Sequence, residues 1–273
     1  MFFLKLYKVL FANVYKFKRI LRIFFRIDQV IKIDTRKIIL PPGHMLSWYN
    51  DIYKDYDKFL PNIIRNIKPK GSIIDIGANV GDTLWRLINA NEELDYYCIE
   101  GDDYFFKYLT KNKELLDVKL KKKVFLIKEL VGDNLSGNLR ETSGESKFTG
   151  TKSLVESEIG LKSKTLDNII TNNKIENIKL IKVDVDGYDH NVLFSGMNTI
   201  KKFKPDLFFE YMDHRKDEYN KLILDLVNIN YTSWTVLDNY GSTLFKNKHH
   251  SSVLDLINSN KKNYNIDIYC KIN

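Results

Sequence analysis

The stretch from Gly71 to Thr83 constrains the fold of this chain more than any other. Its β-branched residues Ile73, Ile74 and Ile76 predict a short strand that is buried on both faces. Small, turn-forming residues follow the strand, and a helical pattern begins at Asp82. A strand, a tight turn and a helix start in this order make a place where a ligand can approach the backbone closely.

Strands and helices alternate along most of the chain after this stretch. Further strands are predicted at 96–99, 124–127, 178–183 and 206–209. Helical patterns between them predict an α/β fold with a doubly wound, mostly parallel sheet. The tail lacks another long helical pattern, and its strand-like segments predict an antiparallel addition at one edge of the sheet: 231–236, 243–245 and 266–272.

The 273 residues are enough for one sizeable α/β domain and an extension. We expect three parts, namely a basic amphipathic arm at 1–37, a lead-in of strand and helical cover at 38–70, and the sheet domain at 71–273. The two cysteines, Cys98 and Cys270, lie in apolar strand-like runs. We expect them to be buried free thiols in a reducing, cytoplasmic compartment.

The net charge of +8 lies entirely in the arm. The arm holds ten Lys or Arg against two Asp, while the other 33 basic and 33 acidic residues cancel. Because the body is neutral, the composition disfavours nucleic acid as a partner.

Residues 1–27 interleave aromatic and aliphatic side chains with bases. On a helix, six of the bases fall on one stripe: Lys5, Lys8, Lys16, Arg19, Arg22 and Arg26. No apolar run there approaches the roughly 20 residues of a membrane span. Two interpretations remain open. The helix lies on an anionic membrane surface at the inner face of the cell membrane, or it packs on the body or a dimer partner and shows its bases to water.

The lead-in carries a polar and aromatic layer directly before the glycine-containing turn. Residues 28–48 predict a small hairpin or a strand addition, and a helical pattern follows from Ser47 to Ile67. Tyr49, Tyr53, Tyr56 and Asp57 lie on this helical part. They either cover a ligand or serve ordinary helix packing.

The turn and the strand after it indicate an adenosine-containing cofactor. The pattern Asp75-x-Gly77-x-Asn79-x-Gly81 lets backbone amides face a ligand, and Glu100, which ends the next strand, can accept both hydroxyls of a ribose. The dinucleotide fingerprint of nicotinamide oxidoreductases has a glycine where Asn79 stands and a later last glycine. An acid at Asp75 suits a cofactor with a free ammonium, such as S-adenosylmethionine. The alternative is a plain tight turn with Glu100 in solvent.

A second group of polar residues lies at the end of the strand at 178–183. Lys182, Asp184 and Asp186 are two residues apart, so they share one strand face and point to the carboxyl edge of the sheet. Methyl transfer from a sulfonium needs an oxygen nucleophile at about 3 Å and a destination for its proton. Asp184 or Asp186 could hold or deprotonate a hydroxyl, and His190 or His214 could be the base. The alternative is a structural ion pair between Lys182 and Asp184, with Asp186 as a helix cap.

Three segments together resemble the FkbM-type family of S-adenosylmethionine-dependent O-methyltransferases: Asp75-Ile-Gly-Ala-Asn-Val-Gly-Asp82, Thr165-Leu-Asp167 and Ile181-Lys-Val-Asp-Val-Asp-Gly-Tyr-Asp189. The segment Leu40-Pro-Pro-Gly-His44 also looks like a lead-in that some members carry. The resemblance implies a Rossmann-like class I methyltransferase fold with a seven-stranded sheet. It also implies methylation of a hydroxyl on a sugar or natural product. Many members have Asp-x-Glu-Gly where this chain has Asp184-Val-Asp186-Gly187. The shorter side chain of Asp186 must therefore fill the role that the glutamate has in those members.

The predicted function is O-methyl transfer to a sugar hydroxyl in a surface or lipid-linked glycan. The alternatives are a scaffold that binds the cofactor without turnover and a methyltransferase of a small natural product. The residues expected to bind S-adenosylmethionine are Asp75, Gly77, Ala78, Asn79, Gly81, Asp82, Thr83, Glu100 and Asp184. The residues expected to be catalytic are Lys182, Asp184, Asp186 and His190. Asp184, Asp186, Asp189 and Glu210 could offer oxygen ligands to a divalent metal, but no spacing is diagnostic and we expect no required metal.

Overall fold

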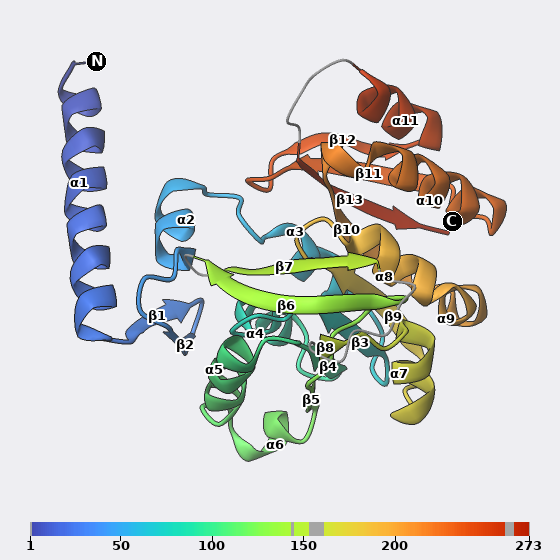
Figure 1. Ribbon diagram of the computed structural model, residues 1–273, viewed down its shortest axis with the longest axis horizontal. Coiled ribbons are helices and arrows are strands. Elements are labelled where there is room, and N and C mark those ends of the chain that lie inside the picture. The colour runs from blue at the N-terminus through green and yellow to red at the C-terminus, as the bar shows by residue number, and fades with distance from the viewer. Residues whose placement is uncertain (1, 143–144, 153–160, 260–264, 273) are drawn as a thin grey trace.

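The computed structural model describes residues 2–142, 145–152, 161–259 and 265–272. Within them the central sheet contains five parallel strands, β3 (Ser72–Ile76), β4 (Asp95–Ile99), β5 (Val124–Ile127), β9 (Ile178–Val183) and β10 (Asp206–Tyr211). Three more strands extend it beyond β10, each antiparallel to its neighbour: β13 (Ile266–Lys271), β11 (Ser233–Asp238) and β12 (Thr243–Lys248). The order is β12-β11-β13-β10-β9-β3-β4-β5 (Figure 1), so the last strand of the chain lies inside the sheet.

The predicted doubly wound α/β sheet with antiparallel closing strands is confirmed. The sheet has eight strands in the described part of the chain, one more than the seven implied by the resemblance, because β12 pairs with the outer edge of β11. The exposed β12 buries little apolar surface, which is why its sequence gives a weak strand signal.

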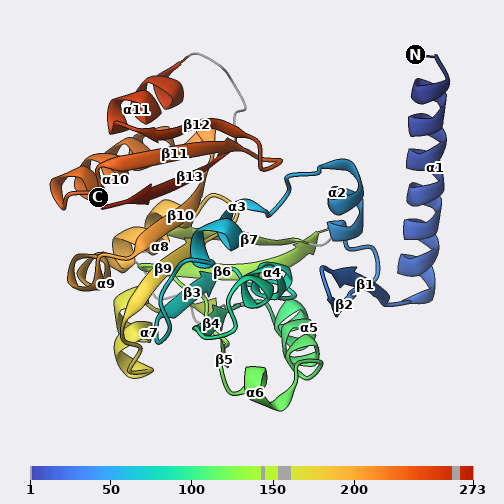
Figure 2. The same cartoon turned by 180° about the vertical axis from the view of Figure 1, so that it is seen from behind.

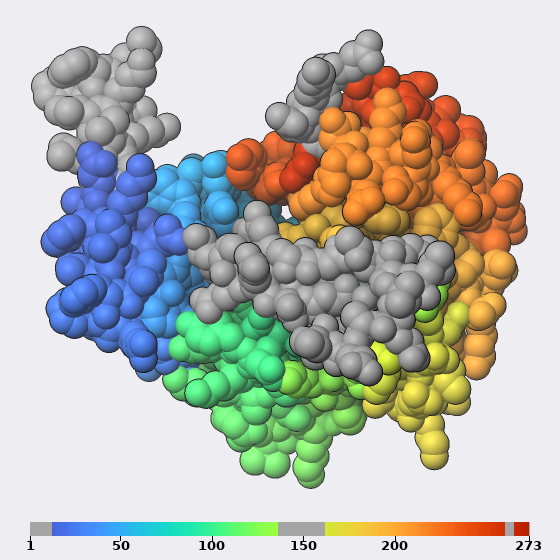
Figure 3. All heavy atoms as spheres, viewed as in Figure 1, coloured from blue at the N-terminus to red at the C-terminus, as the bar shows by residue number. Residues whose placement is uncertain are grey.

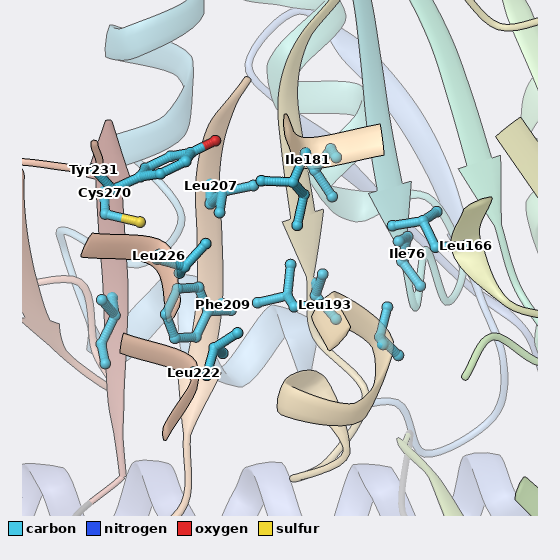
Figure 4. Close-up of a cluster of buried hydrophobic side chains, with 14 of the residues drawn as sticks. Ile76, Leu166, Ile181, Leu193, Leu207, Phe209, Leu222, Leu226, Tyr231 and Cys270 are labelled. Carbon is cyan, nitrogen blue, oxygen red and sulfur yellow. The ribbon is translucent and has the colours of Figure 1, made fainter. Parts of the chain in front are cut away.

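Helices cover both faces of the sheet. One apolar cluster joins the sheet to α2 (Leu46–Ile52), α3 (Phe59–Ile64), α4 (Asp82–Ala90), α5 (Asp103–Lys113) and α6 (Val118–Lys121). The other cluster joins it to α7 (Leu166–Asn172), α8 (Asp189–Ser195), α9 (Met197–Phe203), α10 (Lys216–Asn228) and α11 (His250–Asn258). Figure 4 shows this second cluster, where Leu193 and Phe209 meet Leu222 and Leu226. Side chains of β3 alternate between the two clusters, so both of its faces are buried.

The tail contains a helix that the sequence pattern did not predict. Helix α11 begins after His249, whose side chain accepts a hydrogen bond from the backbone N–H of Ser251. Val253 and Ile257, one turn apart, are its buried residues. The only signals of this helix in the sequence are the spacing of these two apolar residues and the unusual histidine cap. Both are short, and the residues around them favour strands.

The N-terminal part begins with helix α1 (Phe2–Phe25), followed by the antiparallel hairpin of β1 (Gln29–Ile33) and β2 (Arg36–Leu40). The predicted hairpin is therefore present, although the expected boundary at residue 37 falls inside β2. A separate three-stranded sheet contains β6 (Leu135–Thr142), β7 (Glu145–Lys152) and β8 (Leu161–Lys162). A short 3-10 turn, η1 (Asp213–Arg215), precedes α10. Cys98 and Cys270 are free and buried, as expected. Among the described residues, we find no helix with the length and apolarity to cross a membrane.

A single buried amide fastens the N-terminal hairpin to the sheet domain. Asn112 of α5 is fully buried and accepts a hydrogen bond from the N–H of Ile39 at 2.8 Å. Its side-chain NH₂ donates to the carbonyls of Ile39 and Val80, both at 2.9 Å. Asn112 thus gives the outer edge of β2 the hydrogen bonds that another strand would otherwise supply, and it holds that edge against the glycine-containing turn.

We expect Asn112→Ala to lower the free energy of unfolding by roughly 2–4 kcal/mol, because it leaves buried backbone groups of Ile39 and Val80 without partners. Urea titration followed by circular dichroism measures the loss. Asn62→Ala, at an exposed position whose side chain meets only Arg65 among the contacts found, is the matched control and should change stability little. Equal losses in both variants would contradict the role given to Asn112.

Candidate functional site

A cavity of about 490 Å³ opens at the carboxyl edge of the parallel strands, a size typical of small-molecule sites. The lead-in supplies one wall, from His44 to Leu60, and the ends of β3, β4, β9 and β10 supply the opposite wall. The turn between β11 and β12 closes a third side with residues 239–241. The cavity therefore lies at the sheet edge where the parallel order predicts a ligand.

A buried ion pair lies beneath the cavity. Asp75 and Lys182 are neighbours across β3 and β9, and Lys182 Nζ lies 3.0 Å from Asp75 Oδ1 and 3.4 Å from Asp184 Oδ2. Burial alone would lower the pKa of Lys182, but the two carboxylates raise it well above the usual value, so the ammonium is retained. Lys182 lines the cavity and Asp75 does not. Asp75 therefore orients Lys182, in place of the predicted direct contact with a cofactor ammonium.

The glycines of the turn allow segments of the protein to pack closely. Gly77 has φ +77°, and a Cβ atom there would lie 1.9 Å from the carbonyl oxygen of Asp184. The amides of Gly77 and Ala78 donate to the carbonyl of Ile99 at 3.0 and 3.1 Å. Gly81, with φ +91°, leaves room for α5. The expectation that these amides face a ligand is corrected, because the protein itself takes their hydrogen bonds and Gly77 mainly lets β9 approach β3.

Glu100 presents a fixed carboxyl group to the cavity. Its Oε2 accepts the backbone N–H of Asn79, and its Oε1 accepts that of Asp102, both at 2.8 Å. Burial raises the pKa of Glu100 to about 7, although these two amides act to lower it. Each oxygen keeps a further lone pair for a hydroxyl donor. The side chain thus has the orientation and acceptor capacity that a ribose diol requires.

His44 is a cavity residue to which the sequence reasoning gave no role. The N–H of Leu46 donates to His44 Nδ1 at 3.2 Å, so the neutral ring carries its proton on Nε2, which lies 3.4 Å from Asn79 Oδ1. Burial lowers the pKa of His44, which favours this neutral form. The side chain joins the lead-in to the turn that presents Glu100. Only the family-like Leu40–His44 segment pointed to it, because the contact depends on how the lead-in folds back.

The tyrosines of the lead-in line the cavity, which favours the first of the two interpretations given for them. Tyr49 and Tyr56 stack with ring centroids 5.3 Å apart. Tyr53 stacks on Tyr240 of the β11–β12 turn at 4.0 Å and an interplanar angle of 17°. These rings form an aromatic wall, and Tyr240 was not anticipated because it comes from the opposite end of the chain.

A group of carboxyl groups lines the cavity beyond Glu100. Glu210 and Asp267 are directly opposite each other on the antiparallel strands β10 and β13. Burial, and then the nearby Asp184, raise the pKa of Glu210 to about 10, and the same causes raise the pKa of Asp267 well above its usual value. Burial, and then Asp82, raise the pKa of Asp57 to about 7. At neutral pH this acidic wall therefore holds several protons.

Most of the predicted site residues meet in this cavity. Those on its walls are Gly77, Asn79, Asp82, Thr83, Glu100, Lys182, Asp184 and Asp186. Those outside its walls are Asp75, Ala78, Gly81 and His190. His190 packs on the ring of Tyr219 and is not among the residues that line the cavity, so its role as the base stays a prediction. Within the described part of the chain, no three His, Cys, Asp or Glu side chains converge as a metal site would require.

Comparison with protein families decides which class of protein this is. A model of the methyltransferase FkbM domain matches residues 75–253, well over half of the chain. The chain belongs to the FkbM methyltransferase family. The match spans the turn, Glu100 and the Lys182–Asp186 block, and it confirms the resemblance seen in the sequence. The cofactor of this FkbM methyltransferase is S-adenosylmethionine. Comparison with curated proteins gives no significant match.

Solved structures match this chain at low sequence identity. An FkbM methyltransferase from Methylobacillus flagellatus KT is 15% identical, and the alignment covers 82% of this chain with a TM-score of 0.48. This chain spans only 50% of that protein's length. An O-methyltransferase from Bacillus cereus in complex with SAH is 14% identical over 80% of each chain, with a TM-score of 0.48. Similarity at this level says nothing about the acceptor, so the assignment rests on the family match.

The residues of the cavity fit S-adenosylmethionine. Glu100 would hold the ribose hydroxyls, and the apolar side chains of Ile99, Leu130 and Val131 next to it would hold the base. The cofactor carries an ammonium and a sulfonium, and carboxyl groups such as Asp82 also line the cavity. The FkbM domain thus offers a polar contact for each charged or hydroxylated part of the molecule.

We expect Glu100→Ala to weaken S-adenosylmethionine binding by roughly 10- to 100-fold, because the ribose loses its acceptor. Isothermal titration calorimetry measures the affinity, and a thermal melt checks that the fold survives the loss of two amide contacts. Glu176→Ala, at an exposed position, is the control. An unchanged dissociation constant in a folded Glu100→Ala protein would show that the ribose does not bind at Glu100.

Glu210→Gln should stabilise the cofactor-free protein increasingly as the pH rises. The pKa of Glu210 is about 10 in the folded state and about 4.3 in the unfolded state, so between these values the folded wild type binds more protons and loses stability with rising pH. Glutamine does not titrate. Urea unfolding should show a gain of roughly 1–3 kcal/mol at about pH 8 and little gain at about pH 4. Glu218→Gln, on a partly exposed side chain, is the control, and a gain independent of pH would contradict the assignment.

Proposed function

We propose that this FkbM methyltransferase transfers a methyl group to the oxygen of a sugar hydroxyl in a glycan. One observation carries the proposal, namely that tyrosine rings and carboxyl groups line the same cavity. Tyrosine rings can pack on the apolar C–H face of a sugar ring, and carboxyl oxygens accept hydrogen bonds from its hydroxyls. A small natural product with a similar face and hydroxyl remains the second candidate, and the acceptor panel below distinguishes the two.

The charged residues of the cavity restrict the class of acceptor further. Lys182 is the sole Lys or Arg among the described residues that line the cavity, and Asp75 and Asp184 already pair with it. Glu210 and Asp267 face each other without a cation between them in the described contacts. An acceptor with a phosphate or carboxylate near the reacting hydroxyl would find no unpaired Lys or Arg among the described wall residues, so these features support a neutral sugar.

The same environment supports a specific route for the proton of the hydroxyl. S-adenosylmethionine supplies an electrophilic methyl group on a sulfonium when it is bound. The pKa of Glu210, raised by burial to about 10, leaves it protonated at neutral pH and a poor acceptor of another proton, and burial likewise raises the pKa of Asp267. Asp184 lies 3.4 Å from Lys182, lines the cavity and has a side chain that is 55% exposed. We therefore give Asp184 the role of base, while Asp186 next to it can hold the hydroxyl.

The test is methyl transfer from isotopically labelled S-adenosylmethionine to a panel of acceptors, comprising neutral oligosaccharides, the same sugars with phosphate or uronic acid groups, and phenolic natural products. We expect label in the neutral sugars, in a base-stable methyl ether located by NMR. Labelling of nitrogen or carboxylate, or of phenols alone, would contradict the proposal. Cofactor binding without transfer to any acceptor would favour the non-catalytic scaffold.

Variants assign the roles within the cavity. Asp184→Asn should lower kcat by roughly 100-fold or more with cofactor affinity nearly unchanged, since the proton loses its acceptor. Tyr240→Ala should raise KM for the sugar, whereas Tyr240→Phe, which keeps the ring, should not. Asp217→Asn, exposed on α10, is the control for a simple change of charge. Equal kinetics for Tyr240→Ala and Tyr240→Phe would show that the ring does not contact the acceptor.

A further inference from the structure

Helix α1 stands at one edge of the molecule, with α2 and the β1–β2 hairpin as its neighbours in both views (Figures 1 and 2). The space-filling view shows its described atoms, in blue, as a column at that edge (Figure 3). The side chains described on it are those from Asn13 onward. They show which face of the helix meets the protein and which does not.

One face of α1 is attached to the segment that begins the lead-in. The Tyr15 hydroxyl lies 2.9 Å from Ser47 Oγ, and Arg19 Nε donates to the carbonyl of Gly43 at 2.8 Å. Arg22 donates to the side chain of Gln29 at 2.9 Å. Arg19 and Arg22 thus point toward the body. Of the predicted basic stripe, Arg19 and Arg22 are therefore directed at the protein, whereas Lys16 and Arg26 are exposed.

The opposite face of α1 is apolar and exposed. Phe17, Ile20 and Phe24 are 61%, 62% and 77% exposed, and Leu21 lies among them at 38%. Their spacing of three and four residues places them on one side of the helix. Large apolar side chains gathered in this way mark a surface that binds something, because single exposed apolar residues are scattered on ordinary surfaces.

The charges around this face indicate what it binds. From residue 13 to 27 the chain carries five bases and no acid. Lys16 and Lys18 are exposed and lie about 100° to either side of Phe17, so they flank the apolar face, and Arg26 is exposed near its end. Two copies of α1 joined by these faces would bring bases against bases. An anionic lipid surface complements both the apolar face and its basic flanks.

We propose that the outward face of α1, formed by Phe17, Ile20, Leu21 and Phe24, docks the protein on an anionic lipid bilayer surface. The helix lies in the plane of the interface, with its apolar side chains among the lipids and Lys16 and Lys18 at the headgroups. The surface is then one helix diameter, about 10 Å, from the Gly43–Ser47 segment, whose residues His44 to Leu46 line the cavity. The proposal stands apart from the sugar acceptor, since lipid binding is measured without one.

The experiment is flotation of the full chain with vesicles made of phosphatidylcholine and phosphatidylglycerol in equal parts, and with vesicles of phosphatidylcholine alone. We expect wild type to float with the mixed vesicles and to be released by high salt. The variant F17S/I20S/F24S should bind about tenfold or more weakly. K16Q/K18Q/R26Q should lose about a hundredfold on mixed vesicles. Calorimetry with S-adenosylmethionine confirms that each variant is folded.

The matched control is V118S/L224S/L244S, which removes three exposed apolar side chains elsewhere on the body and should float like wild type. Failure of wild type to float with the mixed vesicles overturns the proposal. So does equal flotation of F17S/I20S/F24S and wild type. Analytical ultracentrifugation tests whether a second copy of the chain binds this face instead. A dimer that F17S/I20S/F24S dissociates, without vesicle binding by wild type, would make this face a contact between copies of the chain.

Discussion

The site depends on the buried ion pair between Asp75 and Lys182 at the centre of the sheet. Both side chains lie on strands without solvent around them, and each would be an uncompensated charge without the other, at a cost of about 3–5 kcal/mol. The pair has a directional effect as well. It holds the Lys182 ammonium at the carboxyl edge of the sheet, where Lys182 Nζ lies 3.4 Å from Asp184 Oδ2 at the cavity wall. Gly77 completes the arrangement, since only a residue without a side chain lets the backbone of Asp184 come so close to the turn.

The carboxyl groups beyond this ion pair lower the stability of the protein when no ligand is bound. Glu210 and Asp267 face each other across two strands, a placement that an ordinary sheet avoids for like charges. Burial first, and then the nearby Asp184, raise the pKa values of both groups, so protonation is favoured when no ligand is bound. A nearby cation would favour these carboxyl groups in their ionised form, so the wall suits a site for a positively charged cofactor.

Local signals in the sequence predicted the parallel core, because each strand is a short β-branched run between turn residues. They also placed Glu100 and Lys182 at one edge, since the ends of parallel strands coincide. Other features depend on distant segments. The contact of His44 with Asn79 and the stack of Tyr53 on Tyr240 exist only once the lead-in and the β11–β12 turn have met over the sheet. The glycines show the limit most clearly, because a sequence reveals that a small residue is required but not whether a ligand or a neighbouring strand takes the space.

The position of β13 within the sheet affects the order in which the protein can fold during synthesis. This strand is the last in the chain, yet it lies between β10 and β11 and contributes Asp267 to the cavity. During synthesis, β11 and β12 leave the ribosome before the strand that joins them to the rest of the sheet. They cannot take their final places, and Tyr240 cannot reach Tyr53, until residues 266–271 have emerged. A chain that stops before residue 266 therefore lacks both the strand that connects β11 and β12 to β10 and the Asp267 side of the cavity.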